Sequence, residues 1–249
     1  MAKPKQKFDT SGENDHEKIR SIGNRKKFHP HDLISISPLT ENQKEFFYAY
    51  NSNVPMILQS GCAGTGKTFL ALYSALHQVF DPSTPYEKVC IFRSAVDSRK
   101  IGFLPGSEDD KGSAYETPYQ QIAADVMKFN NPYPMLKSLG YLEFHLTSHK
   151  RGTTFDNTIF LLDEIQNFDS GELMTILTRC GENSRIILCG DSKQNDLERY
   201  REKSSFGYLQ KLINNMPYDS TAIIKYTVDD VVRSGLVKDI LIADSGIVD

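Results

Sequence analysis

The chain has 249 residues, of which 39% are hydrophobic and 24% charged, and its formal net charge is −3 at pH 7. This composition is typical of a globular protein; it excludes a disordered or fibrous chain and a global basic field for nucleic acid. The four cysteines are far apart and include no C-x-x-C pair, which favours free thiols in a reducing compartment. With no apolar stretch long enough for a membrane helix or a signal peptide, we expect a cytoplasmic protein.

Residues 1–32 are polar and contain almost no large apolar side chains. Such a segment buries too little surface to offset the entropy of ordering it, so we predict a flexible polar tail over 1–32 and one domain over 33–249.

The apolar pattern of the domain predicts alternating helices and strands. Strands are predicted over 54–59, 88–93, 141–146, 158–163, 185–190 and 222–226. Helices are predicted over 38–50, 69–80, 117–129, 170–180, 205–214 and 229–242. Continuous apolar strands that alternate with helices indicate an α/β fold, a mostly parallel sheet with helices on both faces. In the last helix, Val232, Leu236 and Ile240 form a stripe that we expect to face the core.

Residues 61–68 read Gly-Cys-Ala-Gly-Thr-Gly-Lys-Thr and match the phosphate-loop pattern G-x-x-x-x-G-K-[S/T] in full, between a predicted strand and a predicted helix. The glycines let successive N–H groups turn inward as a cradle for phosphate, and the helix adds the positive end of its dipole. Lys67 is expected to reach the β- and γ-phosphates and Thr68 to offer its hydroxyl to Mg²⁺. The residues predicted to bind ATP here are Gly61, Ala63, Gly64, Thr65, Gly66, Lys67, Thr68 and Phe69.

Two acidic residues, Asp163 and Glu164, end the apolar strand 158–163 and are expected at the carboxyl edge of the sheet, where open α/β sheets bind ligands. Asp163 is the predicted Mg²⁺ ligand and Glu164 the residue that orients or deprotonates the attacking water; the competing interpretation is a helix cap. Gln194, after the strand 185–190, is either a γ-phosphate contact or a solvated loop residue. Gln43 fits both adenine recognition and a capping box with Thr40.

Several segments together resemble the PhoH family of P-loop ATPases, which is similar to superfamily-one helicases. The resembling segments are 61–71, 93–96, 102–106, 151–155, 162–167, 177–181, 190–194 and 230–233. The resemblance implies one RecA-like ATPase core. It implies nucleotide contacts at Gly64, Gly66, Lys67 and Thr68, metal binding and hydrolysis at Asp163 and Glu164, γ-phosphate sensing at Gln194 and a phosphate contact at Arg233. It also implies action on RNA or other single-stranded nucleic acid and ring-shaped oligomers.

The sequence departs from the family pattern at three places. Cys62 and Ser94 stand where proline is expected, and the segment 107–111 is more acidic than a loop that faces nucleic acid. These departures concern the nucleic-acid contacts more than the ATP site.

The about 217 residues after the tail hold one such core and not two. A two-lobed helicase supplies a charge-neutralising arginine from its second core, so we expect a homo-oligomeric ring, such as a hexamer, with ATP at its interfaces. Arg179 and Arg233 are the candidate arginines, in trans or, for Arg233, within the chain; a surface ion pair is the alternative for both. Arg93, Lys150 and Arg151 are candidate nucleic-acid contacts.

The sequence therefore predicts a Mg²⁺-dependent ATPase that acts on or with single-stranded nucleic acid, RNA above DNA, with helicase-like character. The alternative is a nucleotide-gated assembly or regulatory module in which hydrolysis is incidental. A small-molecule kinase and a GTPase are less favoured, because no arginine-rich lid and no N-K-x-D motif are found. Tyr115, Tyr119 and Tyr133 either stack bases or pack inside the domain, and packing is the favoured interpretation.

Overall fold

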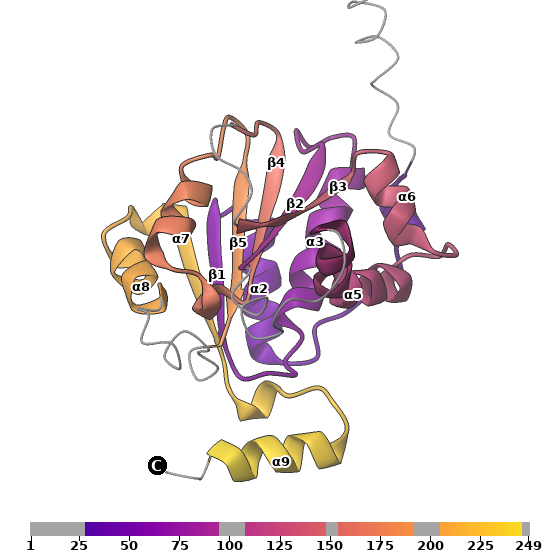
Figure 1. Ribbon diagram of the computed structural model, residues 1–249. Helices are drawn as coiled ribbons and strands as arrows, with labels where there is room; N and C mark the ends of the chain where they lie inside the picture. Colours follow the sequence, from indigo (N-terminus) through magenta and orange to yellow (C-terminus); the bar gives the residue numbers. More distant parts are fainter. Residues whose placement is uncertain (1–27, 95–107, 148–153, 192–204, 246–249) are drawn as a thin grey trace, which may run out of the picture.

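The computed structural model describes residues 28–94, 108–147, 154–191 and 205–245 (Figure 1). Within these ranges, six parallel strands form one sheet in the order β3-β2-β4-β5-β1-β6. The strands are β1 (Met56–Gly61), β2 (Lys88–Arg93), β3 (Leu142–Leu146), β4 (Thr158–Asp163), β5 (Arg185–Gly190) and β6 (Thr221–Tyr226). Every strand predicted from the sequence is confirmed, and so is the parallel α/β fold.

Helices cover both faces of the sheet (Figure 1). The helices are α2 (Glu41–Asn51), α3 (Lys67–Phe80), α5 (Glu108–Val126), α6 (Pro132–Ser138), α7 (Ser170–Leu177), α8 (Phe206–Asn214) and α9 (Gly235–Ser245). One core lies between the sheet and α2, α3, α5 and α6, and a second core lies between the opposite face and α7 and α8. Strand β4 is buried at every position, as its continuous apolar sequence predicts.

The segment 107–140 contains two helices, α5 and α6, where the sequence predicted one helix over 117–129. Helix α5 starts at Glu108 and continues through Pro118, and α6 begins directly at Pro132. Proline is favourable in a first helical turn, where its missing N–H has no partner to lose. The prolines that indicated an irregular segment therefore mark, at Pro132, the start of a helix.

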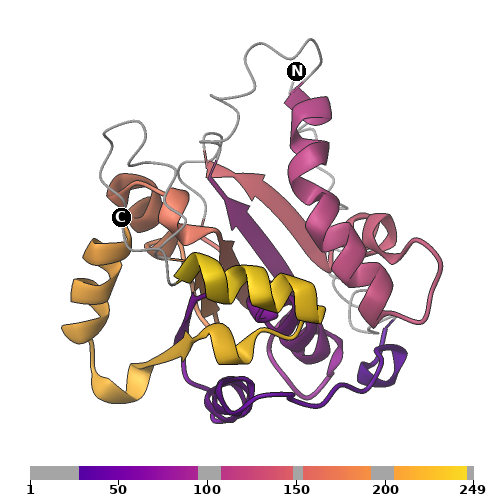
Figure 2. The same cartoon turned by 90° about the horizontal axis from the view of Figure 1, so that it is seen from below.

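The predicted helix over 229–242 is wrong in extent and in its packing. A short 3-10 helix spans Val228–Asp230, and α9 begins only at Gly235. Figure 1 shows α9 below the sheet and apart from it, and in the view from below α9 lies in front of the rest of the domain (Figure 2). Val232, Leu236 and Ile240 are 39%, 71% and 57% exposed, so the predicted core-facing stripe does not face the core. The pattern identified an apolar face but could not show that the other helices already cover both faces of the sheet.

The core includes residues that precede Leu33. Phe28 is buried, and its ring lies 5.2 Å from Phe80 and 5.5 Å from Tyr141. The division at residues 32 and 33 stays a prediction, although the packing of Phe28 extends the domain towards the amino terminus. No helix of the described ranges combines the length and the apolar character needed to cross a membrane.

Arg185 is fully buried at the start of β5, where it ties α2 and α3 to the sheet. Its guanidinium donates to the carbonyl oxygens of Val54 at 3.0 Å and Tyr50 at 2.6 Å and to Gln78 Oε1 at 3.1 Å. It also lies 3.9 Å from the centre of the Tyr50 ring. The side chain gives the Val54 carbonyl a donor and adds a charged donor to the Tyr50 carbonyl, which also accepts from Asn53 N at 3.2 Å.

We predict that Arg185→Met lowers the free energy of unfolding by about 3 kcal/mol, because the Val54 carbonyl, the Tyr50 carbonyl and Gln78 each lose a charge-assisted hydrogen bond. Urea denaturation followed by circular dichroism measures this difference. Lys225→Met on the exposed side of β6 is the matched control and is expected to change the stability by less than about 0.5 kcal/mol. Equal effects of the two substitutions would contradict the role of Arg185.

Candidate nucleotide site

A cavity of about 990 Å³ opens at the carboxyl edge of the sheet. The ends of β2, β4 and β5, the loop after β1 and the segment after β6 all contribute to its lining. The sequence-predicted residues that line it are Gln43, Ala63, Gly64, Thr65, Gly66, Lys67, Thr68, Phe69, Arg93, Asp163, Glu164 and Arg233. The structure therefore brings together residues that are up to 190 positions apart in the sequence.

Glycine is required at two kinds of position in the loop 61–66. Gly64 and Gly66 have φ angles of 75° and 85°, and Gly66 directly precedes α3. Gly61 has a φ of 121°, and a Cβ atom added there would overlap the carbonyl oxygen of Tyr226 on β6. These left-handed conformations turn the loop over the amino terminus of α3, where its dipole favours an anion.

The ammonium group of Lys67 lies across this loop. Nζ donates to the carbonyl oxygens of Gly61 at 2.7 Å and Cys62 at 2.6 Å. Burial lowers the pKa of Lys67, while neighbouring carboxylates such as Asp191 and Glu164 oppose that shift. A phosphate group in the cavity would offer Lys67 stronger, charge-assisted hydrogen bonds than these neutral carbonyls.

Thr68 and Asp163 meet in the lining of the cavity. Thr68 Oγ1 donates to Asp163 Oδ1 at 2.9 Å, and the hydroxyl of Tyr119 donates to the other carboxylate oxygen at 2.8 Å. Burial, and then the Asp163 charge, raise the pKa of Tyr119 far above its ordinary value, so this phenol stays a donor. A hydroxyl oxygen and a carboxylate oxygen at this distance are the ligand types that Mg²⁺ prefers.

Glu164 follows Asp163 in a left-handed backbone conformation, with a φ of 55° that non-glycine residues rarely adopt. Gln166 Nε2 donates to Glu164 Oε2 at 2.5 Å. Burial raises the pKa of Glu164, and the adjacent Asp163 charge raises it further. The strained turn therefore holds a second carboxyl group with increased proton affinity beside the first.

Gln166 and Tyr119 are site residues to which sequence analysis assigned no role at this site. Gln166 is 1% exposed, and its Oε1 accepts from the backbone N–H of Asp191 at 3.0 Å, so one side chain joins Glu164 to the end of β5. Position 190 requires glycine, because a Cβ atom there would lie only 2.8 Å from Gln166 Oε1. Gln166 stands two residues after Glu164 in the sequence, but nothing local shows that its side chain reaches Asp191, which follows β5.

Tyr119 was predicted to pack or to stack on bases. Tyr119 is fully buried, and Tyr115 and Tyr133 are only 8% and 2% exposed. The packing interpretation is therefore confirmed for all three tyrosines. The contact between Tyr119 and Asp163 could not be foreseen, because it depends on α5 crossing the strand end.

Gln43 joins α2 to the phosphate loop. Thr40 Oγ1 accepts from the backbone of Gln43 at 3.3 Å, as in the predicted cap, but the side chain of Gln43 goes elsewhere. Its Oε1 accepts from Leu39 N at 2.7 Å and its Nε2 donates to the Thr65 carbonyl at 3.1 Å. Gln43 lines the cavity as well, and adenine recognition stays a prediction.

The segment after β6 packs against the phosphate loop. The N–H of Val232 donates to the carbonyl of Gly64 at 3.1 Å, and a Cβ at Gly64 would lie 3.4 Å from Arg233 Cδ. Asp230 fixes this segment, since its carboxylate accepts from Asn42 Nδ2 at 2.7 Å and from Thr227 N at 2.9 Å. The exposed Arg233 therefore lines the cavity of its own chain.

The other candidate arginines lie in different places. Arg93, at the end of β2, lines the nucleotide cavity, and its contact with nucleic acid stays a prediction. Arg179 is only 6% exposed and lines a second cavity on the side of α7, so the structure does not bring it to the nucleotide cavity. Gln194, Lys150 and Arg151 lie outside the described residues.

The comparison with protein families decides the relationship. The model of the PhoH-like protein family matches residues 35–244. The chain belongs to the PhoH-like protein family. It is 32% identical over 211 residues to a PhoH-like protein of Mycobacterium bovis and 31% identical over 208 residues to one of Bacillus subtilis. Each alignment covers 83% of this chain.

These family members are longer than this chain. The alignments span 57% of the Mycobacterium bovis protein and 63% of the Bacillus subtilis protein. Among solved structures, the large terminase of bacteriophage HK97 is similar with a TM-score of 0.49 and 12% identity, over 92% of this chain and 51% of the terminase.

We predict that Glu164→Gln stabilises the protein at neutral and higher pH. A raised pKa means that the folded state binds this proton more tightly than the unfolded state, so its stabilising effect is present at low pH and is lost as the pH rises. Glutamine removes that loss. Urea unfolding at a series of pH values should show a gain that is largest near about pH 8 and shrinks towards about pH 4.

Glu45→Gln, on the exposed side of α2, is the control and should show no such pH-dependent gain. A Glu164→Gln variant that is less stable than the wild type at about pH 8 would contradict the repulsion between the two carboxyl groups.

Proposed function

We propose that the chain binds Mg-ATP in the 990 Å³ cavity and hydrolyses it. One observation carries this proposal: the loop that holds Lys67 and Thr68 meets the pair Asp163 and Glu164, through a 2.9 Å hydrogen bond between Thr68 and Asp163. A phosphate cradle and a carboxylate–hydroxyl pair at one strand edge are the two parts that phosphoryl transfer needs. Membership of the PhoH-like family supports the same conclusion.

Each residue then has a specific task. Lys67 and the N–H groups of the loop bind the phosphates, while Thr68 and Asp163 would hold Mg²⁺, which neutralises phosphate charge when bound. Tyr119 fixes the Asp163 carboxylate by its 2.8 Å hydrogen bond. Glu164 orients the attacking water and takes up its proton, a task to which its raised pKa is suited.

We expect Lys67→Ala to abolish Mg-ATP binding in calorimetry, because the half-buried cation proposed to bind the phosphates is lost. Glu164→Gln should keep binding and lower kcat by about 10² to 10⁴-fold, the usual contribution of a general base. Lys44→Ala on the exposed side of α2 is the matched control for both measurements. An unchanged kcat in Glu164→Gln would contradict the role of Glu164 as the general base. A wild type that bound no Mg-ATP would contradict the proposed binding site.

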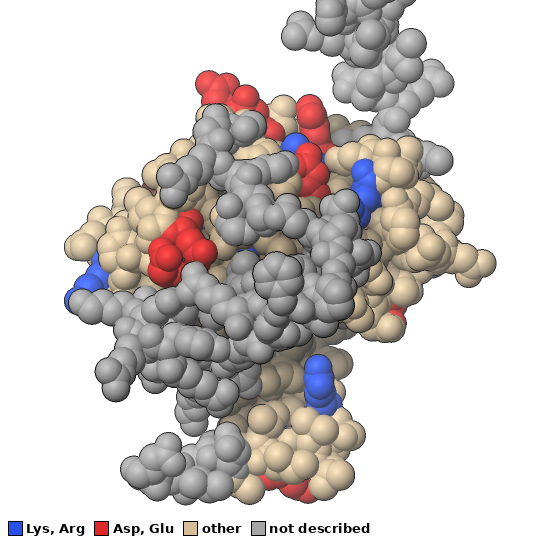
Figure 3. All heavy atoms as spheres, in the orientation of Figure 1, with Lys and Arg blue, Asp and Glu red and all other residues tan. Residues whose placement is uncertain are grey.

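We further propose that turnover is coupled to single-stranded nucleic acid, RNA in particular. Support comes from the family resemblance of the sequence. On the face drawn in Figure 3, the described Lys and Arg side chains are scattered and form no continuous basic patch, so the resemblance alone carries this proposal. The test is the ATPase rate with and without single-stranded RNA, single-stranded DNA and duplex at a stated salt concentration. Stimulation by single strands supports the coupling, and a rate that none of them changes contradicts it.

Arg233 is the arginine that we propose for the transition-state charge, acting within its own chain. Its stem packs on Gly64 and its side chain lines the same cavity as Lys67. From the sequence, Arg233 could act within its own chain or in a neighbouring subunit. Its location supports action within its own chain.

Arg233→Ala is therefore expected to lower kcat by about 10³ to 10⁵-fold. Mixing Arg233→Ala with Lys67→Ala distinguishes the two arrangements. In trans, mixed assemblies contain sites with both residues and recover activity; in cis, no site does. Recovery of ATPase activity in the mixture would contradict the proposal, and the same mixture prepared with wild-type chains is the control.

A second candidate function is nucleotide-gated assembly, which the exposed apolar face of α9 favours. Leu236, Ile240 and Ile242 are 71%, 57% and 45% exposed, and α9 begins two residues after Arg233. A second copy of the chain that covers this face would form the homo-oligomer expected from the sequence. Light scattering with Mg-ATP tests it: assembly that Glu164→Gln keeps and Lys67→Ala loses would favour this function over a hydrolase.

A further inference from the structure

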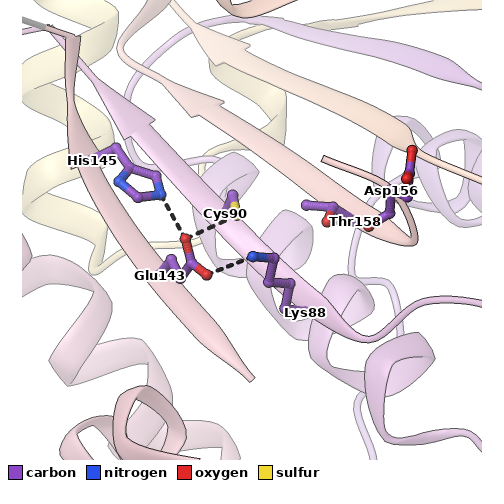
Figure 4. Close-up of polar contacts among 6 residues, drawn as sticks. All are labelled: Lys88, Cys90, Glu143, His145, Asp156 and Thr158. Atoms are coloured by element: carbon purple, nitrogen blue, oxygen red, sulfur yellow. Dashed lines mark hydrogen bonds and ion pairs between the residues drawn. The ribbon is translucent and has the colours of Figure 1, made fainter. Parts of the chain in front are cut away.

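Three side chains of different metal-binding chemistry meet on the edge of the sheet, away from the nucleotide cavity (Figure 4). They are Cys90 of β2 and Glu143 and His145 of β3. Glu143 Oε2 lies 3.0 Å from His145 Nε2 and 3.9 Å from Cys90 Sγ, and all three atoms lie within 4.8 Å of one another. These three ligand types converge from two neighbouring strands.

The register of the strands explains why they meet. Cys90 pairs with Glu143 and Phe92 with His145 in the parallel ladder, so all four side chains project from the same face. This is the face of the second core, to which Cys90 and Phe92 belong. A polar side chain on a face that packs against the core needs a hydrogen-bond partner. Here the side chains of Cys90, Glu143 and His145 provide partners for one another.

Lys88 prepares the carboxylate for this arrangement. Its Nζ donates to Glu143 Oε1 at 2.5 Å, which leaves Oε2 directed at the thiol and the imidazole. Burial favours the neutral form of Glu143, but the hydrogen bond and charge of Lys88 outweigh it and lower the pKa of that carboxyl below its ordinary value. A second contact that orients a carboxylate is typical of metal centres.

The surroundings combine an apolar shell with access. The rings of Phe92 and Phe155 lie 5.1 Å and 6.1 Å from the His145 ring. Cys90 is fully buried, whereas the Glu143 side chain is 33% exposed. His145 also lines the second cavity, of about 390 Å³, which gives an ion a path from solvent.

We propose that Cys90, Glu143 and His145 form a binding site for a borderline transition-metal ion, zinc above all. Sulfur, nitrogen and carboxylate oxygen together suit Zn²⁺ and do not suit Mg²⁺, which prefers oxygen alone. Tetrahedral zinc with bonds of about 2.0–2.3 Å holds its ligand atoms about 3.3–3.6 Å apart. The observed separations are 3.0 Å, 3.9 Å and, for the third pair, within 4.8 Å, so side-chain shifts of about 1 Å reach that geometry.

Three protein ligands leave one position of a tetrahedral ion for water. The bound ion would replace the hydrogen bonds among the three side chains and connect β3 to β2. Because β3 pairs only with β2 among the described strands, such a connection would stabilise the free edge of the sheet. The site is independent of the proposed ATPase and stands or falls separately from it.

Cobalt substitution of the full chain tests the proposal. Co²⁺ added to the reduced protein should produce a sulfur-to-cobalt charge-transfer band, and Zn²⁺ should displace it. Cys90→Ser should remove the band, while Cys62→Ser and Cys180→Ser, which change free thiols elsewhere, should keep it. Zn²⁺ at about 100 times its Kd should raise the Tm of the wild type by about 5 °C or more, and that of Cys90→Ser much less.

His145→Gln and Lys88→Met keep the test decisive if Cys90→Ser folds poorly. His145→Gln should abolish the band, and Lys88→Met should weaken Zn²⁺ affinity by about 10 to 100-fold, the usual effect of a partner that orients a ligand. A wild type without the band, or a band that survives both Cys90→Ser and His145→Gln, would overturn the proposal and leave a hydrogen-bonded cluster.

Discussion

The hydrogen bond between Thr68 and Asp163 is the contact on which the site depends. It joins the helix after β1 to the end of β4, and the two strands are separated by β5 in the sheet. Only a parallel register that ends all three strands at one edge brings a hydroxyl and a carboxylate within hydrogen-bond distance there. A one-residue slip of β4 would exchange the side chains that face its two cores and separate Leu162 from Phe92 and Leu188, so packing on both faces fixes that register.

Local pattern was sufficient for the parts of the fold and site that are local. Apolar runs and glycine spacing among neighbouring residues were enough to predict the six strands, the phosphate loop and the position of Asp163 and Glu164. Tyr119, Gln166 and the path of α9 do not, since each depends on which distant element lies opposite. Gln166 joins Glu164 to Asp191 across 25 positions, a contact that no local pattern encodes.

The arginines show the same limit more sharply. Arg93, Arg179 and Arg233 looked alike in sequence as cations near family motifs, but the sheet places them in different surroundings. Arg93, at the end of β2, and Arg233, after β6, both line the nucleotide cavity. Arg179 is buried and lines the second cavity beside α7. Charge type predicts what a residue can bind, while strand order decides which cavity it lines.

Gly61 has a consequence that extends past the phosphate loop. Its bare α-carbon lets the end of β6 run directly alongside β1, and β6 leads to the segment that holds Arg233 over Gly64. A larger side chain at position 61 would separate the two backbones and move the arginine together with the loop. The position of the glycine loop and the position of Arg233 therefore both depend on the close backbone contact between Gly61 and Tyr226.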